Sequence, residues 1–219
     1  MSELKSLKKE KDDEGTHEGI HFSKQELTFL VCEAICILFY GLFTTFDGPL
    51  TSPLSNKATD VVTNDFLKEK YPLFQDVHIM IFVGFGFLMV FLKNNSLCSV
   101  GFNYLIACWA IQIAILFTGF WHNIAEFYKD PNHEWKKIEL TVKYMILGDF
   151  AAGAVLISFG AILGKVSLFQ LWAMATLEVF FYCLNEAIVI EILKIYDIGG
   201  SIVIHVFGAF FGLSVCLFY

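Results

Sequence analysis

Six apolar stretches, each about as long as a membrane-spanning helix, constrain the fold of this chain more than any other feature of its sequence. A helix needs about 20 mostly apolar residues to cross a bilayer, whereas a membrane β-barrel shows short alternating strands. The sequence therefore predicts an all-α, polytopic transmembrane helical bundle formed by residues 26–219, after a polar tail at residues 1–25. The six predicted spans cover residues 27–46, 74–92, 100–121, 141–163, 167–192 and 198–219.

Composition supports a membrane protein and argues against several other classes. Charged residues make up 17% of the chain, compared with about 25% in soluble domains. No arginine and no basic stripe is present, so we expect no binding of nucleic acid. The six cysteines form no CxxC pair, and we expect neither a disulfide framework nor a metal site. HExxH, GxSxG and phosphate-loop motifs are missing, so we expect no enzyme and no cofactor.

The polar tail indicates how the chain is oriented in the membrane. It lacks the apolar stretch of a cleavable signal peptide, so we expect the first span to direct insertion of the chain into the membrane. Its lysines favour a cytoplasmic N-terminus by the positive-inside rule. The predicted long connections at residues 47–73 and 122–140 also hold lysines, although acidic residues dilute them. The connections at 93–99, 164–166 and 193–197 are short.

Several ionisable residues lie inside the predicted spans. A charged side chain at the bilayer centre costs on the order of 3 kcal/mol or more, so such residues tend to mark function. Asp149 lies in the middle of the fourth span and needs hydrogen-bond donors there. Glu178 has no obvious partner, whereas Glu186 could orient another helix or attract cations at a pore entrance. Asp76 and His78 open the second span, where solvation or helix capping would suffice. We keep Asp76, His78 and Asp149 as candidate structural or vestibule residues.

Asp197 and His205 are the most informative polar pair. On a continuous α-helix, eight residues separate them by about 12 Å and turn them by roughly 80°, so they cannot touch. Asp197, at the start of its helix, is placed to cap free backbone amides. Gly199 and Gly200 leave room there for a close helix or a permeant. His205 is then either a satisfied structural residue or a pathway residue that titrates near physiological pH.

Small residues recur in the later spans and predict close helix contacts. Gly208 and Gly212 form a GxxxG pair in the last span. Such positions let backbones approach each other in lipid, where apolar packing alone provides little drive for association. The sequence therefore predicts a tight bundle, with further glycines at positions 84, 86, 148, 153 and 160.

Four motifs in order carry a family resemblance: YPLFQDVHIMIFVGFGFLMVFL, SVGFNYLIACWAIQ, ISFGAILGKVSLFQL and DIGGSIVIHVFGAFFGL. Together they resemble the Rhesus (Rh) glycoprotein branch of the ammonium transporter family, closely over residues 71–219. The resemblance implies an integral protein of the plasma membrane that carries ammonia or ammonium. It also implies homo- or hetero-trimers of Rh-type subunits, each with a narrow hydrophobic pore between two inverted five-helix repeats. The span at 27–46 is then the extra helix in front of the first repeat.

The resemblance also implies roles for single residues. The D-x-G-G-S-x-x-x-H motif makes Asp197 the ammonium-site aspartate, which shapes the helix end, and His205 the first of two pore histidines. Phe150, in GDF, matches one of two stacked phenylalanines that gate the external mouth. Glu186, in NEA, matches an acidic residue near the outer vestibule. Aromatic faces hold ammonium by cation–π attraction, and a dry pore disfavours the ion relative to neutral ammonia.

The sequence departs from the family in containing one repeat. The second pore histidine and the second gate phenylalanine are absent, so we expect the chain to be part of a longer or assembled transporter. The alternative is a truncated, non-conducting partner that associates with full-length Rh-type trimers. Two copies in opposite orientations would be a further way to replace the missing half. Without partner helices, we expect the inner faces to expose His205 and Asp149 to lipid.

Overall fold

Six helices in the computed structural model are long and apolar enough to cross a membrane. The model describes residues 23–45, 70–91 and 97–218, so most of the predicted polar tail lies outside it. The predicted all-α class and the number of spans are confirmed. The spanning helices are Lys24–Phe43, Lys70–Phe91, Cys98–Lys129, Val142–Ile162, Leu168–Ile192 and Ile198–Cys216.

Three of the six spans within the described ranges change helix type along their length. The second contains a π-helical turn, Met80–Gly84, and ends in α4 (Phe85–Phe91). The fifth consists of α7 (Leu168–Glu186) and the π-helical turn Ala187–Ile192. The sixth runs through a 3₁₀ turn and a π-helical turn before α8. The remaining bounds are α2 (Lys24–Phe43), α5 (Cys98–Lys129), α6 (Val142–Ile162), Ile198–Gly200 (3₁₀), Ser201–Val206 (π) and α8 (Phe207–Cys216).

The chain divides into two compact units, residues 1–35 and 36–219. In the first unit, a capping box starts α2. The Glu26 carboxylate accepts the backbone N–H of Ser23 (2.7 Å), and the Ser23 hydroxyl accepts the backbone N–H of Glu26 (3.2 Å). This reciprocal pair satisfies amides that the first helical turn leaves free, so the helix begins before the predicted span.

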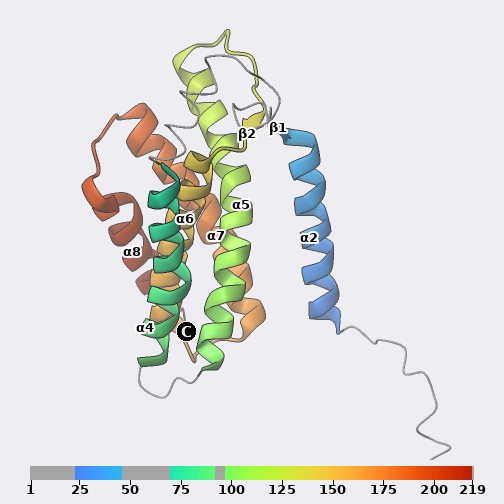
Figure 1. Ribbon diagram of the computed structural model, residues 1–219, viewed down its shortest axis with the longest axis vertical. Coiled ribbons are helices and arrows are strands. Elements are labelled where there is room, and N and C mark those ends of the chain that lie inside the picture. The colour runs from blue at the N-terminus through green and yellow to red at the C-terminus, as the bar shows by residue number, and fades with distance from the viewer. Residues whose placement is uncertain (1–22, 46–69, 92–96, 219) are drawn as a thin grey trace, which may run out of the picture. The chain divides into compact units, whose positions relative to one another are not determined.

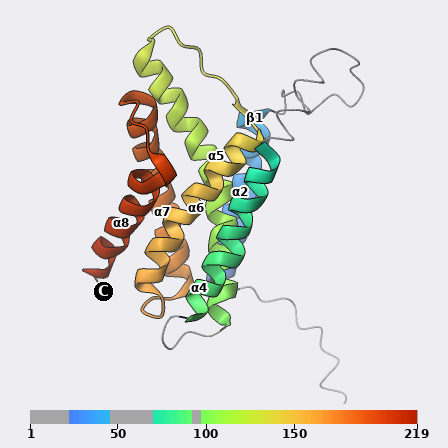
Figure 2. The same ribbon diagram turned by 60° about the vertical axis from the view of Figure 1, so that its left-hand side comes forward.

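In the second unit, α6 is the most buried of the six spans and lies between its neighbours in both ribbon views (Figures 1 and 2). It is apolar on all sides, as expected of a central helix. Its core side chains are mostly small, which allows α5 and α8 to approach it closely. The fully buried apolar residues of α6 are Ala151, Ala152, Ala154, Val155, Leu156 and Phe159.

The predicted close approach at the GxxxG pair is confirmed. A Cβ added to Gly208 would lie 2.7 Å from the carbonyl oxygen of Ala154. A Cβ added to Gly212 would lie 2.9 Å from the Cα of Ser158. Only hydrogen side chains on α8 therefore allow this contact with α6. Gly84 differs, because an added Cβ would meet only a Met80 side-chain atom of its own turn, at 3.7 Å.

Two features beyond the spans differ from the prediction. Helix α5 continues to Lys129, through part of the segment at 122–140 that was predicted as a connection. Polar residues mark the end of the apolar span, but they do not interrupt the backbone hydrogen bonds of a helix. The helix can therefore continue beyond the end of the span. A short parallel pair also joins β1 (Thr44–Thr45) to β2 (Ile138–Glu139), and Leu140 donates its N–H to the Thr45 carbonyl at 3.0 Å.

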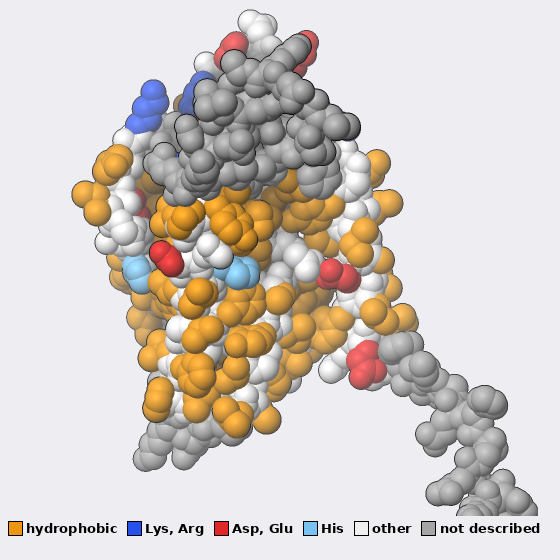
Figure 3. All heavy atoms as spheres, in the orientation of Figure 1, with side chains coloured by type: hydrophobic (Ala, Val, Ile, Leu, Met, Phe, Trp, Pro, Cys, Tyr) orange, Lys and Arg blue, Asp and Glu red, His pale blue; other side chains and the backbone are white. Residues whose placement is uncertain are grey.

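Large apolar side chains remain exposed along the spans, and Figure 3 shows hydrophobic side chains over most of the described surface on one face. Soluble monomers rarely expose apolar patches of this extent, whereas a bilayer is the natural solvent for them. The second unit is thus a helical bundle whose outer surface suits lipid and whose core surrounds α6.

Candidate functional site

Asp197 precedes the last span, and its carboxylate binds the backbone ahead of it. Both carboxylate oxygens lie 3.1 Å from the N–H of Ile202, and one of them accepts the N–H of Val203 at 2.9 Å. Gly199 and Gly200 have φ angles of 70° and 67°. These left-handed conformations turn the chain back, so the carboxylate reaches amides five and six residues further on. The predicted capping role of Asp197 is confirmed.

The same turn corrects the predicted geometry of the Asp197–His205 pair. The two residues do not share a continuous α-helix, because a 3₁₀ turn with left-handed glycines comes first and a π-helical turn follows. The separation and rotation calculated for an α-helix therefore do not apply. The predicted exposure of His205 is confirmed.

The segment that carries His205 lies beside the part of α6 that carries Phe150. A Cβ added to Gly153, one turn beyond Phe150, would lie 3.8 Å from Ile204, the residue before His205. The Phe150 side chain is half-buried. These two candidate pore residues thus come from neighbouring segments of the bundle.

Asp149 is buried, which contradicts its predicted exposure to lipid. Its side chain has no exposed surface, because the helix at residues 70–91 covers it. From that helix, Nδ1 of His78 lies 3.0 Å and 3.3 Å from the two carboxylate oxygens. The expected donor to Asp149 is therefore His78. Asp76 is exposed two residues earlier on the same helix.

Aromatic rings hold the His78 imidazole in place. The rings of Phe74 and Phe82 lie 5.0 Å and 4.7 Å from it, one helical turn before and after. Phe82 in turn makes an edge contact with Tyr104 of α5, with ring centroids 5.4 Å apart. His78 is thus part of the packing between helices, and its imidazole joins the second span to α6.

Glu186 pairs with a histidine that the sequence analysis did not select. Its Oε2 lies 2.9 Å from Nε2 of His122, and both side chains are largely buried. The Tyr144 ring lies 6.3 Å from the imidazole. His122 belongs to the extension of α5, and 64 residues separate it from Glu186, so no local pattern could indicate the pair.

A polar pocket of about 270 Å³ adjoins this pair. Its walls come from the end of α5, the connection to α6, the start of α6 and the π-helical turn after α7. Lys129 bridges two of its carboxylates, at 3.1 Å from Glu126 and 3.0 Å from Glu191. Acidic, basic and aromatic groups therefore meet at this end of the bundle. The lining includes His122, Glu126, His133, Glu139, Tyr144 and Glu191.

Glu178, for which the sequence suggested no partner, lies at a junction of three helices. Its Oε1 forms a short hydrogen bond with the Ser158 hydroxyl of α6, which also lies 2.8 Å from the Gly208 carbonyl of α8. Oε2 has no partner within the described part of the chain. Glu178 is fully buried, so it belongs to the core and not to a surface.

The predicted site residues therefore fall into two groups. Asp149 and His78 bind each other directly. Phe150, Glu186, Asp197 and His205 share no direct hydrogen bond or ring contact with one another within the described ranges. They come instead from α6, α7 and the last span of a single bundle.

Comparison with known proteins identifies the family to which this bundle is similar. The family model described as Ammonium Transporter Family matches residues 28–219. "Ammonium transporter Rh type B" of Danio rerio is 47% identical over 191 residues, which cover 86% of this chain and 39% of the relative. "Ammonium transporter Rh type C" of Sus scrofa is 41% identical over 194 residues, with 86% and 40% covered. The chain thus spans about two fifths of the length of these curated relatives.

Proposed function

Because this chain belongs to the Ammonium Transporter Family, we propose that it takes part in moving ammonia or ammonium across a membrane. The path is a narrow hydrophobic pore, of which this chain supplies one wall. The remaining wall comes from a longer chain or from an associated subunit. The proposal requires no catalytic step and no cofactor.

The entrance to this path lies at the end of the bundle that carries Glu186. Carboxylates in a concave site raise the local concentration of cations, and the adjoining pocket is lined by Glu126, Glu139 and Glu191. His122 holds Glu186 at 2.9 Å and fixes its orientation. Phe150 of α6 is the next residue along the proposed path after the entrance. Its aromatic face attracts an ammonium ion before that ion loses a proton.

The observation that carries the proposal is the set of hydrogen bonds made by Asp197. They fix the start of the helical segment that bears His205, so the carboxylate acts on the path without touching the permeant. His205 then presents an imidazole that both donates and accepts hydrogen bonds in a dry passage. A neutral molecule passes such a region far more easily than an ion does.

The exposed face of the last span suits an assembled protein. Phe210 and Leu213 of α8 are 69% and 60% exposed. We propose that further helices cover this face and complete the pore, within a trimer of Rh-type subunits. We also propose that the protein resides in the plasma membrane with its N-terminus in the cytoplasm.

The same exposed face favours a second candidate function, that of a non-conducting partner. In that case α8 docks on full-length Rh-type subunits and modulates their trimers. Co-purification with a longer relative whose transport does not depend on His205 of this chain would distinguish this function from the first.

Transport by the chain is tested in proteoliposomes. Internal pH is followed by stopped flow after an ammonium jump, beside empty vesicles. When the chain is reconstituted together with a subunit that supplies the other wall, we expect alkalinisation faster than with that subunit alone, loss of the difference in His205→Ala, and its retention in Leu105→Ala, an exposed residue of α5 outside the entrance pocket. Rates no faster than those of the subunit alone, from protein shown to be folded, would contradict transport through this chain and favour the partner function.

A further inference from the structure

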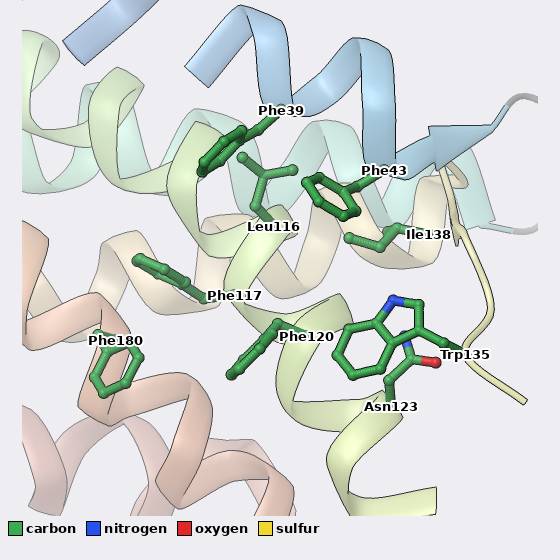
Figure 4. A pocket seen from close by; sticks show the side chains of 9 residues that line it. All are labelled: Phe39, Phe43, Leu116, Phe117, Phe120, Asn123, Trp135, Ile138 and Phe180. Carbon is green, nitrogen blue, oxygen red and sulfur yellow. The ribbon is translucent and has the colours of Figure 1, made fainter. Parts of the chain in front are cut away.

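A second pocket, of about 320 Å³, adjoins the polar pocket and is almost entirely apolar (Figure 4). Its walls come from the last turns of α2, from α5, from α7 and from the connection after α5. Six aromatic rings dominate the lining: Phe39, Phe43, Phe117, Phe120, Trp135 and Phe180.

The one amide side chain in the lining, Asn123, already makes three hydrogen bonds to the backbone. The Asn123 amide nitrogen donates to the carbonyls of Gly119 (2.8 Å) and Lys136 (3.1 Å). Its amide oxygen accepts the N–H of Lys136 at 3.0 Å. Water needs two to four polar partners to occupy a buried site. The pocket therefore favours an apolar occupant over water.

Specific contacts hold the walls apart and in place. The Tyr40 hydroxyl donates to the Gln112 carbonyl at 2.7 Å, which ties the end of α2 to α5. The pairing of Thr44 with Ile138 then ties the chain after α2 to the connection that bears Trp135. Phe39 and Phe43 are thus held opposite α5, as Figure 4 shows. The hollow is a built feature of the fold.

The pocket is continuous with the lipid-facing surface of the spans. Phe39 and Phe43 belong to the last two turns of one span, and both side chains are almost half exposed. Phe117 and Phe120 lie within another span. Trp135, at 56% exposure, stands at the polar end of the pocket. Tryptophan prefers this position at the boundary between hydrocarbon and headgroups.

Two lysines follow Trp135 directly in the chain. Lys136 and Lys137 line the neighbouring polar pocket, which shares Asn123 and Ile138 with the apolar one. Neither ammonium group forms an ion pair within the described residues. Of the three carboxylates that line the polar pocket, those of Glu126 and Glu191 form ion pairs with Lys129. The third belongs to Glu139. Two unpaired cations beside an apolar cavity complement a phosphate attached to a hydrocarbon chain.

We propose that the apolar pocket binds one acyl chain of a bilayer phospholipid, whose phosphate lies at Lys136 and Lys137. An apolar cavity of about 150 Å³ already accepts a benzene-sized molecule, and this one is roughly twice as large. The bound chain fills the space between the end of α2 and α5. None of the proposed pore residues lines the apolar pocket, whereas Lys136 and Lys137 also line the polar pocket at the proposed entrance, so the test reads lipid retention and not transport.

Native mass spectrometry of the full chain, released from phosphatidylglycerol nanodiscs, tests the site. Leu116→Trp fills the pocket from α5. Leu105→Trp makes the same substitution at an exposed position on the same helix and serves as the matched control. Lys136→Glu with Lys137→Glu removes the phosphate contacts at exposed positions. Circular dichroism and size exclusion confirm the fold of each variant, and Phe43→Trp replaces Leu116→Trp if that variant misfolds.

We expect one tightly retained phospholipid in the wild type and in Leu105→Trp. Displacing several methylenes from the pocket should weaken retention by about tenfold or more in Leu116→Trp. The double lysine variant should weaken retention of phosphatidylglycerol and leave that of a sterol unchanged. The proposal is wrong if both tryptophan variants retain lipid equally. Retention of sterol but not phospholipid would also overturn it, as would an absence of retained lipid in the wild type.

Discussion

The Nδ1 atom of His78 lies 3.0 Å from the Asp149 carboxylate, which is fully buried and fixes the second span against α6. His78→Ala leaves this carboxylate without its donor. We expect the free energy of unfolding to fall by about 3 kcal/mol, because an uncompensated buried charge is costly. Reversible denaturation in mixed micelles measures the loss.

Asp149→Asn should be the milder change, because an amide still accepts a hydrogen bond from the imidazole. Combining His78→Ala with Asp149→Ala should cost less than the sum of the two single changes, since both remove one interaction. Asp76→Ala, at an exposed position on the same helix, should stay within about 0.5 kcal/mol of the wild type. Equal losses in His78→Ala and Asp76→Ala would contradict the pairing.

Gly208 and Gly212 set the distance between α8 and α6. Gly208→Ala would place a methyl group 2.7 Å from a backbone oxygen, and Gly212→Ala would place one 2.9 Å from a backbone carbon. Neither atom belongs to a flexible side chain, so we expect each change to destabilise the protein by about 1–3 kcal/mol.

Gly101→Ala provides the matched control for these two substitutions. It lies in α5, and an added Cβ would meet nothing within 4 Å. Alanine has the higher helix propensity, so this change should stabilise the helix by up to about 1 kcal/mol. Thermal unfolding in detergent compares all three variants. A loss of stability in Gly101→Ala as large as in Gly208→Ala would exclude close packing as the cause.

The spans and the GxxxG contact could be predicted because their signals are local. Twenty apolar residues in a row indicate a membrane helix whatever surrounds them. Two glycines at a spacing of four lie on one face and invite a close neighbour. The start of α2 was also readable, since Ser23 and Glu26 form the S-x-x-E signature of a capping box. The predicted span began at residue 27, where the apolar run starts, whereas α2 begins at Lys24.

The pairings within the candidate site could not be predicted in this way. His78 and Asp149 are 71 residues apart, and His122 and Glu186 are 64 apart. Each pairing depends on how helices rotate and shift against each other, and many long-range contacts decide that together. The sequence therefore indicated that Asp149 needs a hydrogen-bond donor and that Glu186 could orient another helix, but only the fold shows that the partners are His78 and His122.

Asp197→Ala should loosen the start of the last span. It removes the acceptor of the Ile202 and Val203 amides, and loss of such a cap costs about 0.5–2 kcal/mol. Hydrogen exchange should accelerate at these two amides first. Asp197→Asn, which keeps one acceptor oxygen, should be intermediate. Ile198→Ala, at an exposed position in the same turn, should leave both amides protected, and equal exchange in all variants would refute the cap.

Glu178 is expected to carry a proton, and the argument rests on counting hydrogens. The Ser158 hydroxyl has a single hydrogen, yet it contacts both the Glu178 carboxyl and the Gly208 carbonyl oxygen. A carbonyl only accepts, and so does an ionised carboxylate. Both contacts are satisfied when neutral Glu178 donates to Ser158 and Ser158 donates to Gly208. A neutral carboxyl also explains how its other oxygen remains buried without a partner in the described chain.

Infrared spectroscopy measures this proton directly. The wild type should show the carbonyl stretch of a protonated carboxylic acid that is absent from Glu178→Gln. Ser158→Ala should keep the band but shift it, because the hydrogen bond to Ser158 is lost. Glu178→Gln should lose less stability than Ser158→Ala, since an amide also donates to Ser158 whereas alanine leaves two buried groups unpaired, at about 1–3 kcal/mol. Identical spectra of the wild type and Glu178→Gln in this region would show that Glu178 is ionised.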